Sequence, residues 1–74
     1  MIKTWNDLKV GNIIHFHGGR LTITEKIVTI VDDRMYITVN VIPADVESEQ
    51  LLGGYYSRGH YSAVSWARIE VEEI

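Results

Sequence analysis

The sequence predicts an all-β fold: a small barrel or rolled antiparallel sheet of four to five strands with one short helix. Runs rich in Val, Ile and Thr, in which apolar and polar residues alternate, cover much of the chain. Glycine and aspartate pairs between these runs are typical of tight turns. The only helix candidate follows the single proline. Since the chain has 74 residues, we expect one domain over residues 1–74.

The chain is expected to begin with a turn that closes one end of the core. In residues 4–8, Trp5 and Leu8 are large apolar side chains in a polar context. Residues 9–12 contain Gly11 next to an asparagine, which is typical of a tight turn. A strand should therefore start at residue 13.

Residues 13–17 are the first predicted strand. Because strand side chains alternate between two faces, one face should carry Ile13, His15 and His17 and the other Ile14 and Phe16. Gly18-Gly19 is a hairpin signal that leads into the next strand.

Residues 20–31 form the second predicted strand. Its first part alternates, with Leu21 and Ile23 facing inward. Residues 27–31 are apolar on both faces apart from Thr29. A strand that bends across both layers of a small barrel is buried on both faces, so we expect residues 27–31 to be buried.

Residues 34–42, after the turn at Asp32-Asp33, show the clearest alternation in the chain. The apolar side chains that should share one face are Met35, Ile37, Val39 and Val41. Three consecutive strands joined by short turns predict an antiparallel meander.

The helix candidate covers residues 44–52. Pro43 suits the start of a helix, Asp45 and Glu47 favour its positive end, and Gly53 is well placed to end it. The alternative interpretation of this stretch is an acidic surface loop.

Residues 63–74 return to the pattern of a strand. Their apolar positions change phase between Trp66 and Ile69. Because strand side chains alternate strictly, this change predicts a bulge or a sharp bend near Ala67-Arg68.

The pattern Asp-Leu-Lys-Val-Gly-Asn-Ile-Ile at residues 7–14 resembles the first turn and strand of many SH3-like barrels. In that family an Asp-x-x-x-Gly-Asp pattern introduces the first strand, and here Asn12 replaces the second aspartate. The resemblance implies an SH3-like barrel and says nothing about function.

Composition restricts the classes of function. The absence of cysteine excludes disulfides and thiolate metal sites. A formal net charge of −3 argues against binding to extended nucleic acid, which depends on Lys and Arg. No apolar run reaches the roughly 20 residues of a membrane span. We therefore expect a cytoplasmic protein with no membrane partner and no cofactor.

Acidic residues are missing from two windows of the chain, residues 8–24 and residues 50–69. These acid-free windows contain Lys9, Arg20, Arg58, Arg68 and all three histidines. If the two windows meet in the fold, we expect a locally positive surface that suits a small anion.

The candidate binding site is the tyrosine-rich segment, residues 53–62. It holds three tyrosines, three glycines, one arginine and one histidine, and no acid. Tyrosine offers a flat apolar face, arginine a fork of donors for phosphate, and glycine lets the main chain approach a ligand. The predicted ligand-binding residues are Tyr55, Tyr56, Ser57, Arg58, His60 and Tyr61, together with Arg20 from the other window.

Other interpretations of these residues stay open. The tyrosines could cap the barrel or form a subunit contact. His15, His17 and His60 are the candidates for a metal site, because three imidazoles suit zinc, although we expect no metal. Ser57 and Ser62 with His60 lack the sequence context of a catalytic triad, so we predict that the protein is not an enzyme.

We therefore expect a non-enzymatic, homo-oligomeric binding protein that sequesters a phosphorylated nucleotide or similar small anion. In general style the short, acidic, β-rich chain resembles small viral proteins that sequester nucleotide immune signals of bacterial hosts. That resemblance implies binding without turnover in the host cytoplasm. The alternatives are an SH3-like protein-interaction module and a binder of single-stranded nucleic acid.

Overall fold

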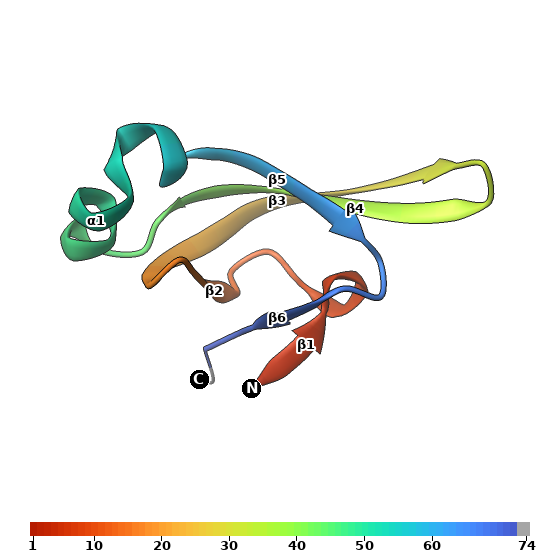
Figure 1. Cartoon of the computed structure of the whole chain (residues 1–74), viewed down its shortest axis with the longest axis horizontal. Helices are drawn as coiled ribbons and strands as arrows, with labels where there is room; N and C mark the ends of the chain where they lie inside the picture. Colours follow the sequence, from red (N-terminus) through yellow and green to blue (C-terminus); the bar gives the residue numbers. More distant parts are fainter. Residues whose placement is uncertain (73–74) are drawn as a thin grey trace.

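The computed structural model describes residues 1–72, and these form two antiparallel sheets and one short helix (Figure 1). The all-β class with one short helix is confirmed. The four-stranded sheet contains, in spatial order, β2 (Ile13–Phe16), β3 (Gly19–Val31), β4 (Arg34–Pro43) and β5 (Gly59–Val64). The two-stranded sheet contains β1 (Ile2–Thr4) and β6 (Arg68–Glu70). The helical elements are the 3₁₀-helix η1 (Trp5–Asp7) and α1 (Val46–Tyr56).

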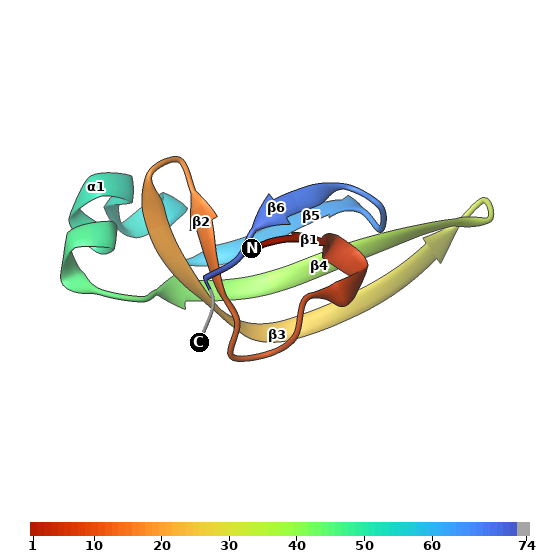
Figure 2. The same cartoon turned by 90° about the horizontal axis from the view of Figure 1, so that it is seen from below.

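The larger sheet is curled, and the smaller sheet lies against one of its faces (Figures 1 and 2). The two sheets are joined where Ile14 of β2 forms an isolated bridge with Val71. Beside it, the Glu72 main-chain N–H donates to the carbonyl oxygen of Ile13 at 2.8 Å. The chain therefore folds as a half-barrel that the β1–β6 pair closes.

The hydrophobic core lies between the two sheets. Its buried members are Trp5, Leu8, Ile14, Leu21, Ile23, Ile37, Val39, Val41 and Val71. The predicted inward faces of β3 and β4 are therefore confirmed, as is the role of η1 in closing the core. Phe16 and Met35 pack against the edge of this cluster.

Both short hairpin turns are present, but the first lies one residue earlier than predicted. His17 and Gly18 have positive φ angles of 48° and 82°, so β2 ends at Phe16 and His17 does not share a strand face with His15. Gly19 instead begins β3. The second turn is at Asp32-Asp33 as predicted, with φ angles of 51° and 64° that define a two-residue hairpin loop.

The prediction that residues 27–31 are buried is wrong. All five are exposed, because β2 pairs only with residues 19–22 and β5 reaches only as far as Tyr36. The outer parts of β3 and β4 therefore project from the body as a two-stranded arm (Figure 1).

The helix is longer than predicted and is bent. It runs to Tyr56 rather than to residue 52, and Gly53, with φ 76° and ψ 162°, interrupts it instead of ending it. The tyrosine-rich segment is therefore not a loop. It contains the last helical turn of α1, the residues Ser57-Arg58 and the first four residues of β5.

The last predicted strand is two strands in different sheets. β5 begins at Gly59, and a turn at residues 65–67 precedes β6. The change of phase that predicted a bulge reflects this turn, in which the Ala67 N–H donates to the carbonyl oxygen of Val64 at 3.1 Å. Residues 73–74 of the predicted strand lie outside the described residues. Across residues 1–72, no helix combines the length and the apolar character that crossing a membrane requires.

Candidate functional site

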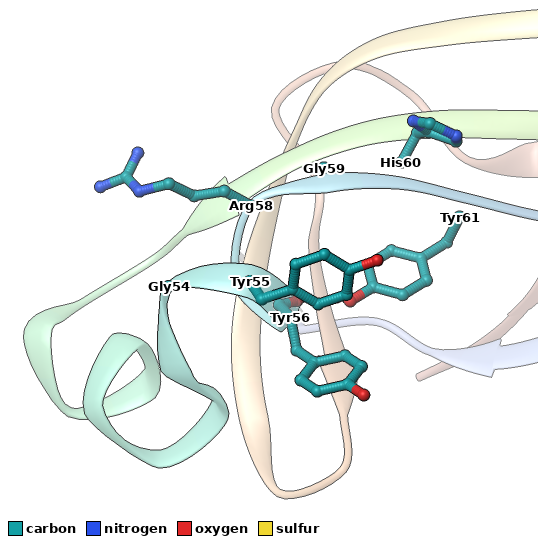
Figure 3. Close-up of a pocket in the computed structure, with 7 residues that line it drawn as sticks. All are labelled: Gly54, Tyr55, Tyr56, Arg58, Gly59, His60 and Tyr61. Atoms are coloured by element: carbon teal, nitrogen blue, oxygen red, sulfur yellow. The ribbon is translucent and has the colours of Figure 1, made fainter.

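The tyrosine-rich segment lines an open pocket of about 410 Å³, and Figure 3 shows the residues around it. Its lining residues are Gly54, Tyr55, Tyr56, Arg58, Gly59, His60 and Tyr61. The volume falls in the range of small-molecule sites, roughly 300–1,000 Å³. Five of the predicted ligand-binding residues therefore border one space.

Glycines shape the main chain around this pocket, which we name the tyrosine pocket. Gly53 takes the left-handed conformation that bends α1, and the Ser57 N–H donates to its carbonyl oxygen at 3.1 Å. Gly59 begins β5 with a φ angle of 136°. Between these two bends, Tyr55 and Tyr56 lie on a single helical turn that projects from the body.

Two of the three tyrosines in the pocket are open to solvent. Tyr55 is 84% exposed and Tyr56 is 58% exposed. Their rings meet edge to face, with centroids 5.1 Å apart and planes at 87°. Because tyrosine combines a large apolar ring with a polar hydroxyl, the exposed pair offers contact area to another molecule.

Tyr61 is the fixed wall of the pocket. Its ring is half-buried against Phe16, with centroids 4.5 Å apart, and its hydroxyl donates to the main-chain carbonyl oxygen of Tyr56. Burial raises the pKa of Tyr61 above its ordinary value, and the neighbouring Tyr56 and Tyr55 hydroxyls raise it further. Tyr61 is therefore a neutral hydrogen-bond donor at physiological pH.

The charged groups lie at the margin of the tyrosine pocket. Arg58 extends away from the tyrosine rings (Figure 3) and donates to Glu49 of α1 at 2.8 Å. Both members of this ion pair are open to solvent, so it contributes little to stability. His60 is exposed on β5, opposite Asn40 of β4.

Arg20, the predicted contribution from the other window, does not line the pocket. Its guanidinium is held by Asp45 at 2.5 Å and by Glu72 at 2.6 Å. Its main-chain N–H donates to the Ser48 Oγ at 2.8 Å. Arg20 therefore fastens α1 to β3 and to the C-terminal segment.

Ser57 does not line the tyrosine pocket either. The side chain is completely buried, and its Oγ has no protein hydrogen-bond partner within residues 1–72. A buried serine cannot present its hydroxyl to a solvent-borne ligand, which explains why it does not line the pocket.

A second, more apolar pocket of about 590 Å³ adjoins the first. Its lining residues are Phe16, His17, Leu51, Leu52, Tyr56 and Tyr61. Tyr56 and Tyr61 belong to both pockets, so the two spaces meet along these side chains. Sequence reasoning missed Phe16, Leu51 and Leu52, although all of them lie in the acid-free windows.

The two acid-free windows do meet, and they do so at this apolar pocket. The positive surface expected from their meeting does not form there, because acids from outside the windows neutralise Arg20 and Arg58, the two arginines of the predicted site. Asp45 and Glu72 pair with Arg20, and Glu49 pairs with Arg58. The site that results is aromatic and apolar, with one paired arginine at its edge.

The three histidines are not assembled into a metal site. They lie on β2, in the β2–β3 turn and on β5, and in the described part of the chain no three His, Asp or Glu side chains are grouped closely enough to hold a metal ion.

No model of a known protein family matches the chain, and no curated protein matches its sequence.

Proposed function

We propose that this chain is a non-enzymatic binding protein whose tyrosine pocket holds a small ligand with a flat ring and a phosphate, such as a phosphorylated nucleotide. The observation that carries the proposal is the exposure of Tyr55 and Tyr56 beside the fixed ring of Tyr61. Three aromatic rings around one open space suit a planar ligand better than they suit any role inside the domain.

The ring of the ligand would stack on Tyr55 or Tyr56. Stacking of a base on an aromatic side chain contributes about 1–3 kcal/mol in single-strand complexes. Tyr61 is held in place by its hydrogen bond and by Phe16, so this wall of the pocket loses little freedom on binding.

The phosphate would be taken by Arg58. An exposed arginine–carboxylate pair is weak, and a phosphate dianion accepts the same guanidinium fork with a larger charge. We therefore propose that the phosphate replaces Glu49 as the partner of Arg58. His60 borders the same space, and its ring N–H would add a second donor.

The proposal is binding without turnover. The residues that line the tyrosine pocket include no carboxylate and no serine, and Ser57, which follows Tyr56 in the chain, is buried. In the proposed role the protein sequesters a nucleotide signal, as do the small viral proteins that the chain resembles in general style.

The adjoining apolar pocket favours a second function, an SH3-like interaction module that binds a peptide. Phe16, Leu51 and Leu52 offer an apolar space next to the tyrosines, which would accept a proline or an aliphatic side chain. Such a peptide would need no phosphate and no contact with Arg58.

Calorimetric titration with linear and cyclic nucleotides distinguishes the two. The nucleotide proposal predicts saturable binding that Tyr55→Ala weakens about tenfold, in line with the loss of one stacked ring, and that Arg58→Ala weakens at least as much. Arg34→Ala, which removes an exposed arginine from the far end of the molecule, is the matched control and should leave affinity unchanged. If the wild-type protein binds proline-rich peptides and no nucleotide, the second function replaces the first.

The exchange of partners at Arg58 has a separate test. Glu49→Gln frees the guanidinium and should strengthen nucleotide binding severalfold. Glu47→Gln removes the same charge from the same helix without changing Arg58, because among the described residues Glu47 has no ion pair. Equal effects from the two variants would mean that Arg58 does not take the phosphate. Binding to oligonucleotides that weakens steeply with salt would instead indicate a single-stranded nucleic-acid binder.

A further inference from the structure

The arm, which we define as residues 26–36 of the β3–β4 hairpin, carries an apolar surface with no role in the pocket. Ile27, Val28, Ile30 and Val31 are each between 45% and 67% exposed. Because neighbouring strand residues face opposite ways, these four side chains cover both faces of β3. A charge-free apolar strand of this kind is normally covered by another chain or by another part of the same one.

The arm also has an open main-chain edge. β3 is bonded to β4 on one side, while β2 covers only residues 19–22 on the other. Ile23 is bonded to Gly11 and Asn12, and beyond it, from residue 25 to residue 31, no main-chain partner on that side is present in residues 1–72. The edge therefore offers donors and acceptors to an incoming strand.

The turn between β3 and β4 determines which residues of β3 point their main-chain N–H and C=O groups away from β4. The two-residue loop at Asp32-Asp33 makes Val31 and Arg34 a hydrogen-bonded pair of the β3–β4 ladder. Since hydrogen-bonded positions alternate along an antiparallel ladder, Val28 and Ile30 point their N–H and C=O groups away from β4. These two residues are the ones that a further strand would bond.

We propose that a second copy of this chain covers the edge, with the two β3 strands antiparallel about a two-fold axis at Thr29. In this register Val28 of one copy lies opposite Ile30 of the other, and both residues have outward-facing main-chain groups. Ile27 likewise lies opposite Val31. Every exposed apolar residue of the strand is then matched with an apolar residue.

The matching of side chains favours this register over the two neighbouring ones. With the axis at Thr29, Lys26 at the base of one arm lies opposite Asp32 at the tip of the other. Moving the axis to Val28 would place Ile30 opposite Lys26 and Val31 opposite Glu25. Moving it to Ile30 would place Val28 opposite Asp32. Both shifts would set apolar side chains against charged ones.

Because each copy uses the same surface, the contact forms a closed dimer. The two four-stranded sheets would become one continuous sheet, and neither arm would keep an open edge. The arm and α1 lie at opposite ends of the molecule (Figure 1), so the dimer leaves both tyrosine pockets free and does not depend on ligand binding.

Introducing a charge at the axis tests the proposal. Thr29 is exposed, and Thr29→Lys and Thr29→Glu each bring two like charges together on the axis. By light scattering after size exclusion, the wild-type protein should have twice the 8.5 kDa mass of one chain, and each variant the mass of a monomer. An equimolar mixture of the two variants should recover the dimer. Val46→Lys, an exposed site on α1, is the matched control and should stay dimeric.

Circular dichroism of each variant shows whether the fold is intact. A wild-type protein that remains monomeric at high micromolar concentration overturns the proposal. Variants that both dimerise as the wild type does would place the interface elsewhere, and a mixture that remains monomeric would exclude the axis at Thr29.

Discussion

The hydroxyl of Tyr61 donates a hydrogen bond to the main-chain carbonyl oxygen of Tyr56, and this bond fastens β5 to the last turn of α1. The two residues are the only members shared by the tyrosine pocket and the apolar pocket in the described chain. Gly53 interrupts the helix before this turn, so the turn is not continuous with the rest of α1. The position of the projecting tyrosines therefore depends on Tyr61.

Replacing Tyr61 with Phe should loosen this turn while leaving the ring packing intact. The phenyl ring keeps the contact with Phe16, and only the hydrogen bond is lost, which typically costs about 1 kcal/mol. Urea denaturation should show this loss, and amide exchange should be faster at residues 54–58. Tyr55→Phe is the control, since the Tyr55 hydroxyl has no hydrogen-bond partner within residues 1–72 and its loss should be neutral. Unchanged exchange in Tyr61→Phe would show that the bond does not hold the turn.

Gly19 should not tolerate a side chain, because α1 packs directly on its main chain. A Cβ atom at this position would lie 2.5 Å from Cδ1 and 2.9 Å from Cγ of Leu52. Overpacking of this kind costs about 1–3 kcal/mol, so Gly19→Ala should lower the urea midpoint. Adding Leu52→Ala removes the clashing atoms, and the double variant should be more stable than the sum of the two single losses predicts.

Gly54→Ala is the matched control for Gly19. Nothing lies within 4 Å of a Cβ at Gly54, and its φ angle is not positive, so alanine should be tolerated. If both variants were equally stable, the packing of α1 on Gly19 would not limit stability.

The alternating strands could be predicted from the sequence, because the alternation of apolar and polar residues indicates directly which side chains are buried. Leu21, Ile23, Ile37 and Val39 have a polar residue between each apolar pair, and all four lie in the core. Residues 27–31 have no such alternation. A run that is apolar on both faces fits burial in two layers and also fits burial against a second chain, and the sequence alone does not separate these cases.

Most residues that line the tyrosine pocket could be predicted from the sequence, but the ion-pair partners of Arg20 and Arg58 could not. The tyrosine-rich segment does form a pocket, because residues near in sequence stay near in space. The ion pair between Arg20 and Glu72 joins residues that are 52 positions apart, and no local sequence pattern predicts it. The same is true of β1, whose three residues are a strand only because β6 returns beside them.

Ser57 and Ser48 should respond in opposite ways to substitution by alanine. Both are buried, but the Ser48 Oγ accepts from the Arg20 N–H, whereas the Ser57 Oγ has no protein partner among residues 1–72. Leaving a buried polar group unpaired costs about 1–3 kcal/mol. Ser48→Ala should therefore destabilise the protein by an amount in this range, while Ser57→Ala should be at least as stable as the wild type. A marked loss on Ser57→Ala would show that its hydroxyl is bonded in solution.

Asp45 should make folding stability depend on acid pH. Hydrogen bonds from the Ser48 main-chain N–H, from the Ser48 side chain and from Arg20 hold the pKa of Asp45 below its usual value of 3.8. Because the folded-state pKa is the lower one, the folded state favours the charged carboxylate. The resulting stabilisation is complete above the usual pKa and is lost as the pH falls through the lowered one.

Asp45→Asn isolates this charge, because asparagine keeps the side-chain oxygen that caps α1 and loses the ion pair with Arg20. Above pH 4.5 or so, well clear of the usual aspartate pKa, the variant should have a lower urea midpoint than the wild type. The gap should narrow steadily as the pH is lowered below this value, since protonation removes the same charge from the wild type. Asp33→Asn, at an exposed turn residue without a partner in residues 1–72, should change the midpoint little at neutral pH. A gap between wild type and Asp45→Asn that stays constant down to strongly acid pH would mean that the two proteins differ by something other than the ionised carboxylate.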